Sequence, residues 1–334
     1  MGIGNKSVFE DASNRVLAGT PLHGGLLDDF IAAVAEAAGD EAEALLAAAR
    51  RIRLQTLGTG GGLCAIVNAK SGRCSENCSF CAQSGHFNTN APVHAFLEVA
   101  EVVRAARAMR ERGATRFGIV TSGLRPTGED FQRLKQCIRE VAALGMGADT
   151  SCGVLTRGEL DELKAAGLSA YHHNLETARS FFPSVCTTHD YEDDVRAVRD
   201  ALEAGLYVCS GGIFGLGESW AQRAELALTL RELNVPSVPV NFLTPIPGTP
   251  MGAREPMQPL EALKTVALLR FLLPGAQLRI CGGRDAVFGA QRGLDPLEAG
   301  ASGLMIGDYL TTKGVRVEED VRNLRAKGWE TGGD

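Results

Sequence analysis

Short apolar runs alternate with longer amphipathic helical patterns along most of this chain, and this alternation constrains the fold more than any other feature. The runs that we predict to be strands are Leu63–Asn68, Arg116–Thr121, Gly147–Cys152, Ala170–Asn174, Leu206–Ile213, Ser237–Leu243, Leu278–Cys281 and Gly303–Ile306. The intervening segments that we predict to be helices include Glu98–Arg112, Gly128–Leu144, Arg157–Ala166, Tyr191–Ala204, Ser219–Leu233 and Pro259–Leu273. Such alternation indicates parallel βαβ units. Eight strands fit an α/β fold of the (β/α)8 TIM-barrel type, with an open doubly wound sheet as the alternative.

The first sixty residues follow a different pattern. Phe30–Ala38 and Glu41–Ile52 are rich in alanine and carry apolar residues at helical spacing, so we predict helices across residues 7–57. The glycine-rich run Gly58–Gly62 then interrupts the pattern. We therefore predict a helical extension over residues 1–60 and a barrel over residues 61–334. In a barrel of this kind, the chemistry lies on loops at the C-terminal ends of the strands.

Composition narrows the classes of partner. The formal net charge is −6 and no run of lysine and arginine forms a basic stripe, so we do not expect nucleic acid. Apolar runs such as Phe271–Leu273 stop far short of the roughly 20 residues that span a bilayer. Met1–Glu10 lacks the apolar segment of a signal peptide, so we expect a cytoplasmic protein. Nine cysteines in a reducing compartment favour metal binding or catalysis over disulfides.

Three cysteines lie on one short loop directly after the first predicted strand. Cys74, Cys78 and Cys81 have the spacing C-x3-C-x2-C. A closed structural zinc site uses four ligands, whereas a four-iron cluster held by three cysteines keeps one iron open. That iron can chelate S-adenosylmethionine (SAM), whose reductive cleavage releases a 5′-deoxyadenosyl radical. Phe80 precedes the last cysteine, where an aromatic ring can pack against the adenine.

The cysteine loop and several further segments resemble the radical SAM superfamily and, from about Ser13 to Lys327, the biotin synthase family. These segments are Asn68–Gly72, Tyr171–Thr177, Cys209–Glu218, Val240–Leu243, Pro247–Pro250 and Gly307–Thr312. The resemblance implies a homodimeric barrel that inserts sulfur between two unactivated carbons of dethiobiotin and consumes two molecules of SAM per biotin. It also implies a second, auxiliary iron–sulfur cluster that donates the sulfur, and a flavodoxin- or ferredoxin-type electron donor.

The same resemblance assigns roles to matching residues. The positions that it implies for SAM binding are Phe80, Asn174, Glu176, Gly211, Ile213, Gly215, Glu218 and Asn241. Those implied for the substrate are Asn174, Asn241, Thr311 and Thr312, the two threonines beside its carboxylate. The catalytic positions are Asn174, Glu176 and Arg279. The alternative for Phe80 is simple packing within the loop, and for the others it is a group that serves only the structure.

The expected set of ligands for the auxiliary cluster is incomplete in this chain. The family uses three strand cysteines and one arginine, but Gly118 and Asp149 stand at two of the cysteine positions, and only Cys209 and Arg279 match. Other cysteines map near the ends of predicted strands. We therefore hypothesise a four-iron auxiliary cluster, carrying an extra sulfide, with this ligand set: Cys152, Cys186, Cys209 and Cys281. The alternative is that these cysteines are small apolar core residues.

Other departures leave questions open. Cys64 and Cys137 are interpreted as structural. Asp194 stands where the family often has an arginine for the SAM carboxylate, and Arg196, two residues on, is a weak substitute because it points elsewhere on a helix. His172 and His173 face opposite sides of a strand, and His189 flanks Cys186.

Two other functions remain as alternatives. One is a related radical SAM enzyme without sulfur insertion, such as a hydrogenase maturase or a methylornithine synthase. The other is a non-catalytic iron–sulfur or zinc scaffold, against which the predicted nucleoside-binding turn Gly211–Glu218 argues.

Overall fold

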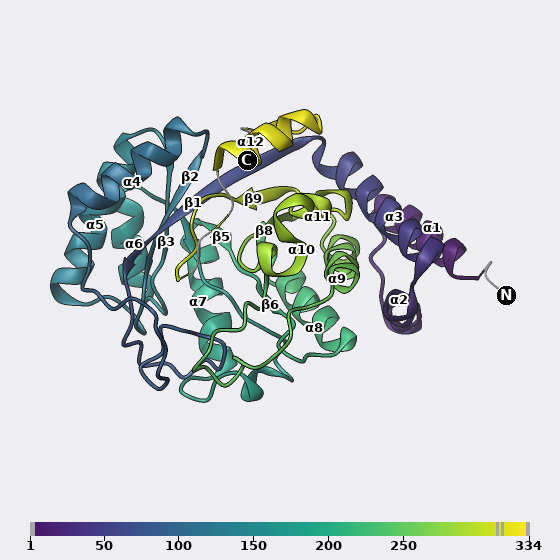
Figure 1. The fold of residues 1–334 in the computed structure, drawn as a ribbon, viewed down its shortest axis with the longest axis horizontal. Helices are drawn as coiled ribbons and strands as arrows, with labels where there is room; N and C mark the ends of the chain where they lie inside the picture. Colours follow the sequence, from purple (N-terminus) through teal and green to yellow (C-terminus); the bar gives the residue numbers. More distant parts are fainter. Residues whose placement is uncertain (1–3, 312–313, 315–316, 332–334) are drawn as a thin grey trace.

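A computed structural model, which describes residues 4–311, 314 and 317–331, contains a closed barrel of parallel strands. Its strands are β1 (Gly60–Lys70), β2 (Arg116–Thr121), β3 (Gly147–Ser151), β4 (Leu168–His172), β5 (Tyr207–Cys209), β6 (Gly212–Phe214), β7 (Ser237–Phe242), β8 (Gln277–Ile280) and β9 (Gly303–Met305). Pairing between β1 and β9 closes the sheet, so the barrel prediction is confirmed and the open sheet is excluded. Figure 1 shows β1 running the length of the barrel.

One predicted strand, Leu206–Ile213, is divided into β5 and β6. The interruption falls at Ser210 and Gly211. A Cβ atom on Gly211 would lie 2.0 Å from the carbonyl oxygen of Pro239, and one on Gly212 would lie 2.4 Å from that of Glu176. The backbone therefore passes closer to its neighbours than any other residue type allows.

The helices that follow the strands form the outer layer around the barrel. They are α4 (Val99–Glu111), α5 (Gly128–Ala143), α6 (Arg157–Ala165), α7 (Tyr191–Glu203), α8 (Trp220–Glu232) and α9 (Pro259–Leu272), all as predicted within two residues. Helix α5 shows why they form, because Phe131, Leu134, Ile138 and Val141 make one buried stripe at helical spacing.

The N-terminal helices cover the outside of the barrel beside α9. They are α1 (Gly4–Leu17), α2 (Gly24–Glu36) and α3 (Gly39–Leu57). The rings of Phe30 and Phe271 pack with their centroids 4.6 Å apart, and Lys264 Nζ donates to the carbonyl oxygens of Ala35 and Ala37. The division into two domains at residue 60 stays a prediction. Within the described residues, no helix is long and apolar enough to cross a membrane.

The C-terminal segments pack on α9, on α3 and on the start of β1. They are α10 (Arg284–Arg292), α11 (Asp295–Glu298), α12 (Val317–Ala326) and β10 (Glu330–Thr331), and β10 pairs with β1. Arg284 makes two hydrogen bonds of 3.0 and 2.6 Å to Asp320, which joins α10 to α12 in a buried ion pair. The guanidinium of Arg53 lies 3.9 Å from the centroid of the Trp329 ring, so the last strand is also tied to α3.

Candidate active site

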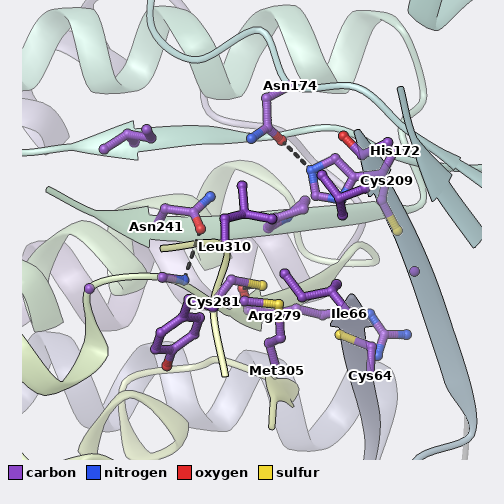
Figure 2. Close-up of a pocket in the computed structure, with 18 of the residues that line it drawn as sticks. Cys64, Ile66, His172, Asn174, Cys209, Asn241, Arg279, Cys281, Met305 and Leu310 are labelled. Carbon is purple, nitrogen blue, oxygen red and sulfur yellow. Dashed lines mark hydrogen bonds between the residues drawn. The ribbon is translucent and has the colours of Figure 1, made fainter. Parts of the chain in front are cut away.

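The barrel contains a cavity of about 320 Å³ that runs inward from its C-terminal mouth (Figure 2). Its wall includes ten of the residues that the sequence singled out: Phe80, Cys81, Asn174, Glu176, Cys209, Ile213, Asn241, Arg279, Cys281 and Thr311. Thr312 lies outside the described residues. Cys74 and Cys78 lie on the same loop as Cys81 but do not line the cavity. The cavity therefore connects the cysteine loop with the residues deeper in the barrel.

The cysteine loop that follows β1 is braced by its own backbone. Cys74 N donates to the carbonyl oxygen of Gln83 at 3.0 Å, and Gly85 N donates back to that of Cys74 at 2.8 Å. Cys81 N donates to the carbonyl oxygen of Cys78 at 2.9 Å. Arg73 takes a left-handed conformation, with φ of 54°, at the start of the loop. Backbone hydrogen bonds thus order the loop that carries the three thiols.

The spread of the loop cysteines (Cys74, Cys78 and Cys81) tests whether they fit an iron–sulfur cluster. Among the described residues, the group of metal-ligating atoms that all lie within 4.8 Å of one another is Glu76, Cys186 and His189. The three loop thiols do not form such a group, so at least two of them lie farther apart than the roughly 3.8 Å between two sulfurs on one tetrahedral zinc ion. Three thiols at this spacing fit several irons better than one ion.

Asn174 and Glu176 follow β4 and lie beside each other on the cavity wall. Asn174 Nδ2 donates to Glu176 Oε2 at 3.3 Å, and Asn174 Oδ1 lies 3.0 Å from His172 Nε2. Glu176 has φ of 62°, and burial raises the pKa of its carboxyl to about 8. Of the two neighbouring histidines, His172 is the one that lines the cavity.

The glycine-rich turn after β5 is held by Glu218. Gly215 N and Leu216 N donate to its two carboxylate oxygens at 3.0 and 2.8 Å, and Arg223 Nε donates to it at 2.8 Å. Gly211 N donates to Asn174 Oδ1 at 3.2 Å, which ties the start of the turn to β4. Glu218 does not line the cavity, so it acts on the turn rather than on a ligand.

Asn241, near the end of β7, links two neighbouring strands at the cavity wall. Its Nδ2 donates to the carbonyl oxygen of Gly212 at 3.2 Å, and Gly282 N donates to its Oδ1 at 2.9 Å (Figure 2). The amide is therefore fixed in orientation by β6 on one side and the end of β8 on the other.

The inner end of the cavity carries three cysteines and an arginine. Cys64, on β1, hydrogen-bonds to Cys281, which follows β8, and Cys209 and Arg279 lie nearby. The hydrogen bond with Cys281 holds the pKa of the Cys64 thiol below its ordinary value. Burial raises the pKa of the Cys209 thiol to about 11. Arg279 is buried and its Nε donates to Ser237 Oγ at 3.2 Å.

The structure corrects the expected convergence of four cysteines. Cys152 is fully buried in the apolar core near Tyr171 and does not line the cavity. Cys186 lies beside the cysteine loop, where its Sγ contacts Asn77 Oδ1 and His189 Nδ1 at 3.4 Å each. Cys209 and Cys281 do meet at the inner end, but their third neighbour is Cys64, which the sequence interpretation treated as structural.

The β2–β3 side of the inner end is occupied by an ion pair. Arg116 Nε and Nη2 donate to the two oxygens of Asp149 at 2.8 and 2.6 Å. Gly118 of β2 is paired with Asp149 of β3, and a Cβ atom on Gly118 would lie 3.1 Å from Cγ2 of Ile66. These are the strands on which the resemblance implied two ligands of the auxiliary cluster.

A network of acids and imidazoles flanks the cysteine loop from outside the cavity. His189 contacts Glu76 Oε2 through Nδ1 at 2.7 Å and Asp194 Oδ2 through Nε2 at 3.3 Å. The hydrogen bond with Asp194 is the largest cause that raises the pKa of His189 to about 11. Asp194 also contacts His173, and Arg196 points to solvent and pairs with Asp193. The positively charged side chain beside Asp194 is therefore His189, and Arg196 does not take the place of the arginine that the resemblance led us to expect there.

A closed (β/α)8 barrel whose first loop carries a three-cysteine iron–sulfur motif at the cavity mouth defines a radical SAM enzyme. Residues 69–230 match the Radical SAM superfamily, and residues 239–330 match the Biotin and Thiamin Synthesis associated domain. The chain belongs to the biotin synthase family. It is 46% identical over 336 residues to the biotin synthase of Geobacter metallireducens, with 98% of this chain and 99% of that protein covered. It is 50% identical over 288 residues to that of Pelotomaculum thermopropionicum, with 85% and 88% covered.

Solved structures agree on the fold. Methylornithine synthase is similar with a TM-score of 0.84 and 18% identity, covering 96% of this chain and 97% of that one. The FeFe-hydrogenase maturase HydG from Carboxydothermus hydrogenoformans is similar with a TM-score of 0.77 and 22% identity, covering 97% and 79%. At such identities the likeness concerns the barrel, and the two alternative functions are not favoured over the one shared with the biotin synthases.

Proposed function

We propose that this chain converts dethiobiotin into biotin by inserting sulfur between two of its carbons, consuming two molecules of SAM per product. The observation that carries the proposal is the single cavity that joins Cys81 at its mouth to Cys209, Cys281 and Arg279 at its inner end. When bound, the four-iron cluster with SAM supplies a 5′-deoxyadenosyl radical and the auxiliary cluster supplies sulfur. The protein's part is to hold both groups and the substrate in one enclosed space.

The loop cysteines are proposed to hold the four-iron cluster, and Phe80 to pack against the adenine. Asn174 and Glu176 are proposed to bind the ribose and the substrate. With a pKa of about 8, Glu176 carries its proton at neutral pH and can both donate and accept hydrogen bonds. Gly211, Ile213 and Gly215 are proposed to approach the adenine, and Glu218 to keep their turn in shape.

Asn241 is proposed to bind the substrate together with Asn174. Dethiobiotin carries a ureido group with two N–H donors and one carbonyl acceptor, and two fixed amides on either side of the β5–β6 segment match that pattern. Thr311 lies on the cavity wall, where a hydroxyl can hydrogen-bond the substrate carboxylate. We propose the same role for Thr312.

The inner end of the cavity is proposed to hold the auxiliary cluster, near Cys209, Cys281 and Arg279. We propose a four-iron cluster with an extra sulfide there, because the set of three cysteines and one arginine that the resemblance implies for a smaller cluster is incomplete in this chain. A homodimer, a flavodoxin- or ferredoxin-type electron donor and a cytoplasmic location are further proposals, the last supported by nine free cysteines.

The test is anaerobic turnover with SAM, a strong reductant and dethiobiotin, followed by separation of the products. Formation of both 5′-deoxyadenosine and biotin is the expected result. Cys137→Ala should form both products as the wild type does, because this buried cysteine lies in α5, away from the cavity, and it serves as the control for loss of a cysteine outside the site. Formation of 5′-deoxyadenosine without biotin in wild-type protein that holds its full complement of iron would contradict the proposal.

A further inference from the structure

The contact between Cys64 and Cys281 has a cause in the barrel's strand register. Ile280 of β8 pairs with Leu304 of β9, and the next residue of β9, Met305, pairs with Cys64 of β1. Closure of the barrel through β9 thus brings the end of β8 level with the middle of β1. Figure 2 shows the side chains of Cys64, Cys209 and Cys281 on the wall of one cavity.

The neighbouring glycine keeps this side of the barrel open for Arg279. Gly303 of β9 pairs with Arg279 on one side and with Gly62 on the other. A Cβ atom on Gly303 would lie 3.2 Å from Cγ of Arg279 and 2.9 Å from the carbonyl oxygen of Gly62. The arginine side chain therefore passes over a position with no side chain, which places its positive charge beside the thiols of Cys64 and Cys209.

The β2–β3 part of the barrel wall, next to β1, offers no thiol to the cavity within the described residues. Asp149 is held by both oxygens in its ion pair with Arg116, and Gly118 has no side chain. Within the described residues, the thiols that line the inner end of the cavity are therefore those of Cys64 on β1, Cys209 on β5 and Cys281 after β8.

We propose that Cys64 is a ligand of the auxiliary iron–sulfur cluster, together with Cys209 and Cys281. The inference rests on the proposed function, since it names the ligands of the cluster proposed there. It assigns the thiolates to β1, β5 and β8, and it replaces Cys152 and Cys186, which the structure places elsewhere. The β2–β3 wall contributes no thiolate to this ligand set.

The experiment isolates the auxiliary cluster by removing the other one. The background is the full chain with Cys74→Ala, Cys78→Ala and Cys81→Ala, reconstituted anaerobically with iron and sulfide. Into it we introduce, one at a time, Cys64→Ala, Cys64→Ser, Cys209→Ala and Cys281→Ala, with Cys137→Ala and Cys152→Ala as matched buried-cysteine controls. Iron and sulfide per chain and the Mössbauer spectrum are measured, and circular dichroism checks that each variant is folded.

The expected result is that the background keeps its auxiliary iron, that each inner cysteine replaced by alanine loses most of it, and that both controls keep it. Cys64→Ser is expected to keep the fold and to retain iron with a changed Mössbauer spectrum, because oxygen replaces sulfur at one iron. Full iron with an unchanged spectrum in both Cys64→Ala and Cys64→Ser would overturn the inference while leaving the proposed function intact. A background variant that binds no iron would instead overturn both.

Discussion

The two cysteine sets of this protein are built in opposite ways. The loop cysteines come from one segment of eight residues, Cys74 to Cys81, whose backbone hydrogen bonds hold it in shape. The inner cysteines, Cys64, Cys209 and Cys281, come from three strands and meet only because the barrel closes. A local sequence pattern is enough to specify the first set, whereas the second is a product of tertiary structure.

This difference has an energetic side. A short loop that already orders its thiols loses little conformational entropy when it binds a cluster. The inner thiols are fixed by strand pairing and by buried neighbours such as Arg279 and Asp149, so their geometry depends on the stability of the whole barrel. A substitution in one set should therefore remove one of the two proposed clusters, and the reaction step that depends on it, while the other cluster remains bound.

The largest effect is expected from Cys81→Ala, which removes a proposed ligand of the loop cluster that also lines the cavity. Replacing a residue that only hydrogen-bonds a metal ligand typically lowers metal affinity or activity by about 10–100-fold. Loss of a ligand itself should therefore lower the rate of 5′-deoxyadenosine formation by more than about 100-fold. The auxiliary iron should remain. Product analysis and iron quantitation on the same preparation measure both effects.

Cys281→Ala is the reciprocal change and should give the opposite pattern, with 5′-deoxyadenosine still formed and biotin absent. The comparison between the two sets fails if Cys81→Ala also strips the auxiliary iron, or if Cys281→Ala abolishes SAM cleavage while the loop cluster is present.

The next largest effect concerns the ion pair that supports the inner end. Asp149→Asn removes the charge that opposes the buried guanidinium of Arg116, which should lower the free energy of unfolding by about 3 kcal/mol, the lower end of the range for breaking a buried pair. Asp161→Asn is the matched control, because its pair with Arg157 is half exposed and should matter by about 0.5 kcal/mol or less. Urea unfolding measures the free energy of unfolding of both variants. Equal losses of stability in the two would show that the Arg116–Asp149 pair does not support the inner end of the cavity.

Much of the barrel was predictable because its signal is local and repeated. Each strand and helix carries its own periodicity, so all eight strand positions and six helices were located from the sequence. The same alternation could have placed Cys152 correctly. Asp149 faces the cavity, and a residue three positions along a strand points to the other side, as Cys152 does.

The remaining errors could not be avoided by pattern reasoning. Cys64 joins Cys281 through the register of β9 with both neighbours, and no local feature of the sequence encodes that register. Cys186 lies in an irregular loop whose position depends on contacts with Asn77 and His189, so its strand-end placement was an assumption. Sites assembled by long-range closure are the ones for which coordinates are needed.

A smaller effect is expected at the turn between the two cysteine sets. In Gly212→Ala the new methyl group would meet the carbonyl oxygen of Glu176 at 2.4 Å, and backbone must move to relieve it. We expect a loss of about 1–3 kcal/mol in unfolding free energy and a raised KM for SAM, with both clusters retained. Gly158→Ala in α6 has open space around it and should be neutral or stabilising. An unchanged KM for SAM in Gly212→Ala would show that the turn does not take part in binding SAM.

The smallest effect tests whether the loop cysteines are also held from outside, through His189. Its folded pKa of about 11 lies above the ordinary value near 6.5, so its interactions with Asp194 and Glu76 stabilise the fold fully below about pH 6.5 and are lost as the pH rises through about 11. His189→Gln should therefore destabilise the metal-free protein by about 1 kcal/mol at pH 6, and by less at pH 10. His94→Gln, whose ring contacts a backbone carbonyl instead of carboxylates, is the matched control for urea unfolding at both pH values. A difference that grows between pH 6 and pH 10 would mean that the imidazole is not held as a cation, and that the loop is ordered by its own backbone alone.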